Sequence, residues 1–264
     1  MEQKFFIDGR FGKIACVHHS PNPTIQAPLV LCMHSFTSNK DRPRMVLWAR
    51  DLAAAGYHAV RFDSFGHGES GGNFSDLTIP KMQQTIEDVY DYCKALPMVD
   101  GSKLGLMGHS LGGYNALLFA ATHQQSGALP RPVVKAVVSI SSPAHYNNTV
   151  QPIFGTTREN WEKAGIASVP NTDGKPLSLK FDYLKSFESF PLMDRLDRLT
   201  VPTLIVHGNK DGVVPFSQAN ELFEKITAPK KLAAIDGADH GFSQSNSSNQ
   251  VSEAMVDWFR QYVK

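Results

Sequence analysis

One serine in the chain stands in a setting that could make it a nucleophile. Ser110 lies in the run GHSLGG, residues 108–113, directly after a β-rich stretch and before a segment rich in Leu, Ala and Phe. A strand that turns into a helix within about one residue strains the backbone of the serine and requires small residues two positions before and after it. Such a turn would present the Ser110 hydroxyl above a sheet and aim the backbone N–H of Leu111 at an oxyanion.

A serine hydroxyl attacks well only when a base removes its proton, and that base is most often a histidine. The histidines after Ser110 are His123, His145, His207 and His240. His123 ends the helix that follows the serine, His145 opens an irregular segment and His207 ends a strand. His240 lies in GADHGF, a loop between the last expected strand and the last expected helix, from which a side chain can reach over the sheet edge. The sequence therefore predicts His240 as the base.

The base needs a carboxylate that holds its tautomer and stabilises the imidazolium. Asp211 lies in HGNKDGVVP, on a tight turn just past the carboxyl end of a strand, where α/β sheets place their sites. Asp239 is adjacent to His240, and neighbouring residues rarely orient each other's side chains well. Asp236 lies closer to the strand. We expect Asp211 to be the acid.

Two backbone N–H groups are the expected oxyanion donors. One belongs to Leu111, and the other to Phe36 in the loop HSFTS that follows an early strand. His34 in the same loop is expected to form structural hydrogen bonds beneath it. The polar and Gly-rich segment 61–70 is interpreted as a scaffold under the site, knitted by Asp63 and His67, and not as part of the chemistry.

The elements that must position these residues alternate along the chain. Short β-rich apolar runs are Gly12–His18, Leu29–His34, Ala59–Phe62, Lys103–Met107, Val133–Ile140, Thr203–His207 and Lys231–Ile235. Apolar residues at steps of three and four predict helices, which are Arg44–Ala55, Met82–Leu96 and Val251–Tyr262. This alternation predicts an α/β fold with a mostly parallel sheet covered by helices on both faces. The first two runs are joined by a short loop, and we expect them to pair as an antiparallel edge.

The interval from Pro143 to Arg198 interrupts the alternation, because it contains no clear strand. A structureless loop of that length is unusual in a compact domain. We therefore expect one domain over residues 1–264 with a small, partly helical cap inserted at 143–198. The interval holds seven Lys and Arg, seven Asp and Glu, and seven aromatic residues. The charges cancel, and most of the aromatic side chains are expected to pack the insertion onto the domain.

Composition excludes several classes of protein. The 264 residues include 26 Lys and Arg against 25 Asp and Glu, which gives a net charge of +1 and no electrostatic basis for binding nucleic acid. Cys16, Cys32 and Cys93 match no metal pattern and suggest no disulfide framework. There is no signal-like start and no membrane-length apolar run. We expect a cytoplasmic protein with no metal and no cofactor. The oligomeric state is left open, a homodimer included.

With these residues in view, the chain resembles an α/β-hydrolase over its whole length, and within that superfamily the cinnamoyl/feruloyl esterase-like branch. The resemblance rests on HSFTS at 34–38, the segment 61–70, the run at 108–113, the turn at 207–211 and Asp239–Gly241. It implies the chain order nucleophile, acid, base, which Ser110, Asp211 and His240 follow. Two positions depart from the family pattern: Ser35 replaces a usual Gly, and Leu111 stands where many cinnamoyl esterases have Gln. Both changes leave the backbone donors in place.

These residues predict a serine carboxylic-ester hydrolase that works through an acyl-enzyme. The expected substrate is a small-molecule acyl or aryl-acyl ester of the feruloyl or cinnamoyl type. The same triad also serves thioesterases, monoacylglycerol lipases and peptidases, since neither fold nor triad determines the substrate. A binding protein that has kept the fold without turnover is the alternative outside enzymes.

Overall fold

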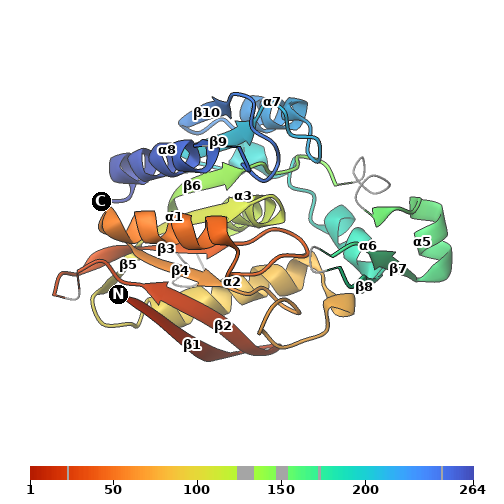
Figure 1. Cartoon of the computed structure of the whole chain (residues 1–264), viewed down its shortest axis with the longest axis horizontal. Helices are drawn as coiled ribbons and strands as arrows, with labels where there is room; N and C mark the ends of the chain where they lie inside the picture. The colour runs from red at the N-terminus through yellow and green to blue at the C-terminus, as the bar shows by residue number, and fades with distance from the viewer. Residues whose placement is uncertain (23, 124–133, 147–153, 172–173, 245) are drawn as a thin grey trace.

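The computed structural model describes residues 1–22, 24–123, 134–146, 154–171, 174–244 and 246–264. A twisted eight-stranded sheet forms the centre of the molecule, in the order β1-β2-β4-β3-β5-β6-β9-β10 (Figure 1). Its strands are β1 (Glu2–Gly9), β2 (Gly12–His19), β3 (Ala27–Met33), β4 (His58–Phe62), β5 (Val99–His109), β6 (Val134–Ile140), β9 (Thr203–Gly208) and β10 (Lys230–Ile235). All seven β-rich runs in the sequence form strands, although Val133 lies outside the described residues.

Six neighbouring strands of the sheet pair in parallel, as predicted, in the order β4, β3, β5, β6, β9 and β10. The expected pairing of the first two runs, β2 with β3, is wrong. β2 is antiparallel, but its neighbours are β1 and β4. The reason is the crossover from β3 through α1 (Pro43–Ala54), which places β4 between them.

The sequence reasoning missed β1. Its run EQKFFIDG pairs with β2 along its whole length and forms one edge of the sheet. An edge strand has one hydrogen-bonding side free and tolerates charged and exposed residues, so it lacks the continuous apolar pattern of the central strands. Phe6 is an example, since its side chain is largely exposed.

Helices cover both faces of the sheet, as predicted. α1 and α8 (Ser247–Tyr262) pack together on one face, over β3, β4, β6, β9 and β10. α2 (Ile79–Cys93), α3 (Leu111–His123) and α7 (Phe216–Lys225) pack on the other. Two separate clusters of buried apolar side chains lie on the two sides, and central residues such as Leu31 and Val30 alternate between them. The sheet is therefore a buried layer that holds its strand ends rigidly.

Between β6 and β9 the chain forms α5 (Arg158–Ala164), β7 (Ile166–Val169), β8 (Leu177–Lys180) and α6 (Asp182–Ser189). These elements lie together to one side of the main sheet (Figure 1, right). β7 and β8 form a separate antiparallel pair, so the expectation of no strand between Pro143 and Arg198 is wrong. The two strands have four residues each and are half exposed, and such short runs carry little apolar signal.

We call residues 143–198 the cap segment. Aromatic side chains form its buried centre, where Phe154 contacts both Trp161 and Tyr183, and Tyr183 contacts Phe187. Tyr183 and Trp161 are almost fully buried. Packing is thus a large part of what these residues do, as the sequence suggested.

Two further properties follow from the described residues. Cys16, Cys32 and Cys93 are all buried free thiols, and burial raises the pKa of Cys32 and Cys93 to about 12. None of the helices in the described part of the chain has the length and apolar character needed to cross a membrane.

Candidate active site

Ser110 occupies the sharp turn between β5 and α3. His109 is the last residue of the strand and Leu111 the first of the helix, so Ser110 alone makes the turn. Its φ of 55° lies in the left-handed region, which is strained for a residue with a side chain. Its N–H donates to the carbonyl of Ile140 at 2.7 Å, which ties the turn to the neighbouring β6.

The positions two residues before and after Ser110 require glycine, for the steric reason that the sequence suggested. A Cβ added to Gly108 would fall on the backbone of Gly112. A Cβ on Gly112 would in turn meet the carbonyl oxygen of Met33, at the end of β3. The first turn of α3 is therefore pressed against the carboxyl end of β3. This contact places the start of α3, with the N–H of Leu111, beside the loop that contains Phe36.

His240 and Asp211 are brought together by two neighbouring loops. The Nδ1 of His240 lies 2.8 Å from Oδ2 of Asp211. The loops are laced to each other by backbone bonds, since Lys210 N–H donates to the carbonyl of Ala238 at 3.0 Å. Gly208 lies so close to Ala238 that a Cβ there would overlap the carbonyl of Ala238. The pair is thus held by backbone contacts as well as by its own hydrogen bond.

The Asp211 carboxylate is buried and accepts several hydrogen bonds. Its Oδ1 accepts from the backbone N–H groups of Val213 and Val214, each at 2.8 Å. Burial alone would raise the pKa of Asp211, but hydrogen bonds from His207 and His240, together with the charge of His240, leave it well below its usual range. The carboxylate is therefore ionised whenever the protein is folded near neutral pH.

Two histidines that sequence reasoning did not assign to the site also touch it. His207, set aside as a base candidate, has its Nε2 3.2 Å from Oδ2 of Asp211. His109, inside the turn motif itself, lies with Nε2 2.8 Å from the carbonyl oxygen of His240. Both are buried. The spacing HGxxD already places a histidine four residues before the acid, but side-chain direction at a strand end depends on the loop that returns over it.

The other candidates weighed from the sequence are engaged elsewhere. The amide of Asn209 donates to Asp236 at 2.8 Å, and the N–H of Ser243 donates to Asp239 at 2.9 Å. The remaining two histidines contact glutamates, His123 with Glu87 at 2.9 Å and His145 with Glu221 at 2.8 Å. Among the weighed histidines, His207 and His240 both contact Asp211, but the His207 side chain is fully buried whereas that of His240 is 19% exposed and can meet a substrate.

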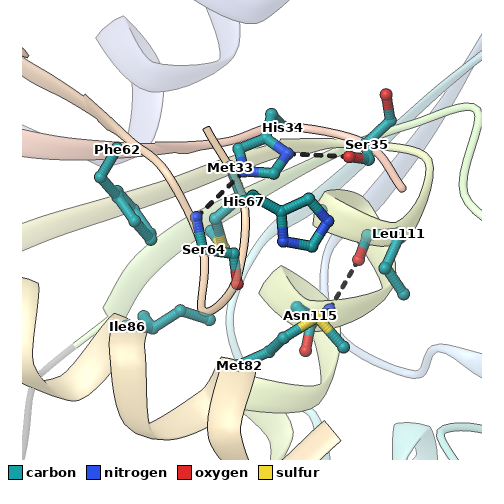
Figure 2. A pocket seen from close by; sticks show the side chains of 11 residues that line it. Met33, His34, Ser35, Phe62, Ser64, His67, Met82, Ile86, Leu111 and Asn115 are labelled. Carbon is teal, nitrogen blue, oxygen red and sulfur yellow. Dashed lines mark hydrogen bonds between the residues drawn. The ribbon is translucent and has the colours of Figure 1, made fainter. Parts of the chain in front are cut away.

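His34 forms structural hydrogen bonds beneath its loop, as expected. Its Nδ1 lies 2.8 Å from the carbonyl of Ser35 and its Nε2 accepts from the N–H of Ser64 at 3.0 Å (Figure 2). The ring of His67 packs against it at 4.8 Å between centroids. These rings line a small, partly open cavity of about 20 Å³ that extends to Leu111 and Asn115. This volume holds about one water molecule, so the cavity is part of the support beneath the loop.

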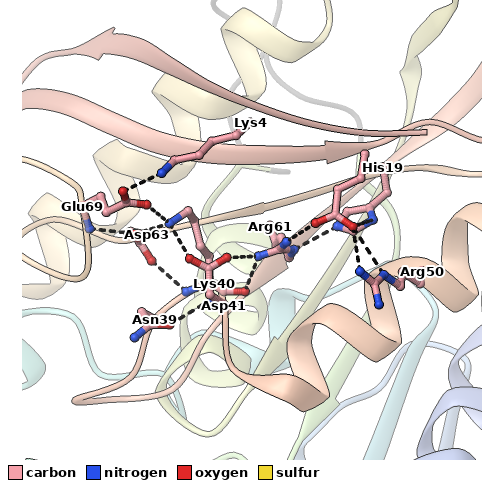
Figure 3. Close-up of polar contacts among 10 residues, drawn as sticks. Lys4, His19, Asn39, Lys40, Asp41, Arg50, Arg61, Asp63 and Glu69 are labelled. Atoms are coloured by element: carbon pink, nitrogen blue, oxygen red, sulfur yellow. Dashed lines mark hydrogen bonds and ion pairs between the residues drawn. The ribbon is translucent and has the colours of Figure 1, made fainter. Parts of the chain in front are cut away.

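A buried ion pair anchors the far end of the Phe36 loop. Asp63 is fully buried at the end of β4, and its carboxylate accepts from Lys40 Nζ at 3.0 Å and from Lys40 N–H at 2.7 Å (Figure 3). The N–H of Glu69 donates to the same carboxylate at 2.9 Å. The structural role that the sequence suggested for segment 61–70 is therefore confirmed for Asp63.

The side chain of Phe36 joins the loop to the cap segment. Its ring stacks on Tyr183 with centroids 5.4 Å apart and meets Phe154 edge-on, also at 5.4 Å. On the core side it contacts Phe74 at 5.5 Å. The backbone position of Phe36 is therefore set partly by the packing of the cap.

The arrangement has the parts needed for acyl transfer by a serine. These parts are a hydroxyl on a strained turn, an imidazole paired with an ionised carboxylate, and an N–H group at a helix start, and the link between the first two that the structure shows runs through His109, which contacts the carbonyl of His240. Among the described residues, no three histidine, cysteine or carboxylate side chains gather closely enough to hold a metal ion.

Comparisons with known proteins extend these observations. A family model described as serine aminopeptidase, S33, matches residues 26–244. The putative esterase YitV of Bacillus subtilis (strain 168) is 26% identical over 256 residues, which cover 89% of each chain. The mitochondrial palmitoyl-protein thioesterase ABHD10 of Mus musculus is 25% identical over 207 residues, 77% of this chain and 65% of that protein. Est1E from Butyrivibrio proteoclasticus, solved with bound ferulic acid, superposes with a TM-score of 0.84 at 26% identity and covers 98% of this chain and 99% of that one.

Proposed function

Because the chain belongs to the serine aminopeptidase S33 family, we propose that Ser110, His240 and Asp211 are its catalytic triad. The comparisons confirm the α/β-hydrolase fold and the resemblance to feruloyl esterase-like proteins, and the chain is a serine hydrolase of the esterase class. The observation that carries the triad is the 2.8 Å contact of His240 with Asp211, in loops laced to each other and joined to the turn of Ser110 through His109.

In the proposed mechanism, Ser110 Oγ attacks the carbonyl carbon of an ester while His240 Nε2 takes its proton. Asp211 holds the opposite ring nitrogen and stabilises the imidazolium that forms. The backbone N–H groups of Phe36 and Leu111 donate to the oxyanion of the tetrahedral intermediate. His240 then protonates the leaving alcohol. A water molecule, activated by the same histidine, hydrolyses the acyl-enzyme and returns the serine.

We propose a small-molecule acyl or aryl-acyl ester as the substrate, of the feruloyl or cinnamoyl kind. The likeness to Est1E with ferulic acid supports this class. An open crevice of about 280 Å³ lies one helical turn beyond the serine, where Tyr114 meets Tyr146 and Phe187 of the cap segment. Its lining combines these aromatic side chains with the polar side chains of His145 and Glu188, and suits a flat aromatic acyl group that carries polar substituents. The balanced charge of the cap segment offers no electrostatic selection for ionic substrates.

The matched variant Ser110→Ala tests the triad. We expect it to fold like the wild type, to lose hydrolysis of a chromogenic short-chain ester by at least a factor of 1,000, on the order of known losses of triad residues, and to lose labelling by a fluorophosphonate. Asp211→Asn should fold and retain a small residual activity. Hydrolysis by Ser110→Ala at a rate near that of the wild type would show that another group carries the chemistry.

A thioesterase is the second candidate, and the likeness to palmitoyl-protein thioesterase ABHD10 supports it. A panel of matched substrates separates the two: a hydroxycinnamoyl methyl ester, a butyryl ester, an acyl thioester and an aminoacyl anilide at one pH. We expect the highest kcat/KM for the hydroxycinnamoyl ester. A preference for the thioester or the anilide would move the assignment to thioesterase or peptidase activity, and both outcomes leave the triad in place.

The organisation of the chain is part of the same proposal. We propose that residues 1–264 form one hydrolase domain in which the cap segment, 143–198, covers the acyl-binding side. Three buried free thiols support a reducing, cytoplasmic location. Limited proteolysis tests the first point, because cleavage within the cap segment should leave the remaining sheet folded and change ester selectivity.

A further inference from the structure

His207 is fully buried at the carboxyl end of β9, and its ring contacts the same carboxylate oxygen of the predicted acid as His240 does. Its Nε2 lies 3.2 Å from Oδ2 of Asp211 and 2.9 Å from the carbonyl oxygen of Val214. Both neighbours can only accept a hydrogen bond, because a backbone carbonyl and an ionised carboxylate carry no proton. The Nε2 of His207 must therefore carry the hydrogen, and it donates to this pair of oxygens.

The other nitrogen of the ring restricts His207 to that role. Nδ1 is buried and has no hydrogen-bond partner in the described part of the chain. A proton there would lack an acceptor, so the tautomer with hydrogen on Nε2 is the one that the surroundings accept. Phe216, at the start of α7, packs edge-on against the ring with centroids 5.8 Å apart and fixes its plane.

The N–H of His207 completes the set of hydrogen-bond donors around the carboxylate of Asp211. Oδ1 is saturated by the N–H groups of Val213 and Val214, which hold that oxygen away from the base. Oδ2 lies 2.8 Å from Nδ1 of His240 and 3.2 Å from Nε2 of His207. A carboxylate that accepts only from His240 at Oδ2 could rotate or shift with the base. With His207 in place, Oδ2 is held by contacts with two imidazoles.

We propose that His207 is a positioning residue that holds Oδ2 of Asp211 in line with His240 and supports its negative charge. This rests on the proposed triad. His207 is not expected to contact the serine or the substrate, and it acts through the carboxylate of Asp211. Residues that hydrogen-bond to metal ligands orient those ligands in the same indirect way.

Three variants test the proposal. His207→Phe keeps a flat ring but removes the donor, His207→Asn keeps a polar group too short to reach Asp211, and His207→Gln retains an N–H near the position of Nε2. We expect Phe and Asn to lower kcat for a chromogenic ester about 10- to 100-fold with little change in KM, and Gln to restore most of it. The control is His123→Phe, which removes a histidine–glutamate contact of 2.9 Å on α3 away from the site and should leave kcat unchanged.

A double-mutant cycle separates positioning from structure. Each variant is made again in the Asp211→Asn background, and the rate of fluorophosphonate labelling is measured in both. If His207 acts through the carboxylate, its loss slows labelling in the wild-type background and changes it by less than about twofold in the Asn background. Thermal denaturation shows whether each variant is folded. If His207→Phe does not fold, His207→Asn and His207→Gln provide the test.

The outcomes are distinct from those for the proposed function. Wild-type activity in His207→Asn, together with an inactive Ser110→Ala, overturns the positioning role and leaves the triad standing. Equal losses in both backgrounds that follow a fall in Tm show a structural role and also overturn it. An active Ser110→Ala instead refutes the triad itself.

Discussion

The backbone of Ser110 is held in the left-handed region, and this strain has a measurable cost. A non-glycine residue in that conformation is destabilised by about 1–2 kcal/mol, whereas glycine adopts it readily. Part of the gain from glycine is lost because it also gives the unfolded chain more freedom. The nucleophile is therefore a site where function is retained against stability.

This strain predicts different stabilities for two inactive variants. Ser110→Gly should be more stable than Ser110→Ala by about 1 kcal/mol, because only glycine relieves the positive φ. Urea denaturation of both, with the slope checked for equality, measures the difference. An alanine variant that is at least as stable as the glycine variant would show that the turn is not strained.

His67 predicts a dependence of stability on pH. Burial, and to a lesser extent the neighbouring His34, lowers the pKa of His67 to about 3 from the ordinary value of 6.5. Above pH 6.5 the ring is neutral in both the folded and the unfolded chain. Between pH 6.5 and 3 only the unfolded chain takes up the proton, so the free energy of unfolding falls as the pH drops, by up to about 1.4 kcal/mol per pH unit.

The matched variant is His67→Asn, which cannot titrate and can still donate to the carbonyl of Phe65 as His67 Nδ1 does at 2.9 Å. We expect its stability to change less steeply than that of the wild type between pH 6.5 and 4. Chemical denaturation at four pH values in this range measures both slopes. Parallel slopes would mean that His67 is already protonated in the folded protein or exposed to water.

Sequence reasoning was most successful where backbone geometry restricts residue type. Gly108 and Gly112 are required by overlap, so their spacing identified the turn. Asp211 and His240 followed from their places after strands, and the structure brings them together. The contact of His109 was not predicted because its partner lies 131 residues later, and that of His207 because the path of the turn to Asp211, four residues on, does not follow from the spacing.

At the scale of elements, β5 supplies both the serine turn and a brace for the base. His109 ends the strand, and its Nε2–H donates to the carbonyl of His240 while its ring packs against Phe242. The loop of the base is therefore fastened to the strand that carries Ser110.

Removing that brace should reduce turnover. We expect His109→Leu to lower kcat about tenfold, because the loop of His240 loses its donor, with KM little changed. His109→Gln can still donate and should retain most of the activity. Steady-state kinetics on one ester, with circular dichroism to confirm folding, provides the measurement. Equal activity in the Leu and Gln variants would show that the hydrogen bond from His109 to the carbonyl of His240 does not support turnover.

Strands could be predicted from the sequence most readily where both of their faces are buried. The runs that became β3 to β6 are continuous and apolar because helices cover both their sides. β1 and the hairpin of β7 and β8 lie outside that layer, so their patterns are weaker. The pairing of β2 with β4 could not be predicted from loop length alone, since it depends on where the α1 crossover returns.

At the scale of the whole molecule, a network of charges links the first strand, the loop after β3 and the end of β4. Lys40 is almost fully buried and contacts Asp63 and Glu69. Burial alone would lower the pKa of Lys40, but the hydrogen bonds that its ammonium group donates to Glu69, Asp41 and Asp63 leave it above its ordinary value. Lys4 of β1 joins at the exposed rim through Glu69.

The two ends of this network should differ in energetic weight. Asp63→Ala leaves a buried lysine without the one of its three carboxylate partners that is fully buried, and should destabilise the protein by about 3–5 kcal/mol. Lys4→Ala breaks an exposed pair at the rim and should cost about 0–1 kcal/mol. Urea denaturation compares the two. A cost for Asp63→Ala as small as that for Lys4→Ala would show that Lys40 is solvated.

The fold as a whole was predictable because alternating strands and helices permit few arrangements. Substrate choice was not, since it depends on how the cap segment packs, and that packing has no fixed spacing in the sequence. Phe36 illustrates the difficulty. Its backbone role follows from its place after β3, but its ring is held by Phe154 and Tyr183, more than 100 residues later.

The three buried thiols also make the protein convenient for site-specific labelling. A maleimide reacts with exposed thiolates, and burial, which raises the pKa of the thiols of Cys16, Cys32 and Cys93, keeps them protonated and out of reach. A cysteine introduced at Ile166, which is 47% exposed on β7, would then react alone without removal of the native residues. A spin label or fluorophore at this position would report the local mobility and surroundings of β7 during a single turnover.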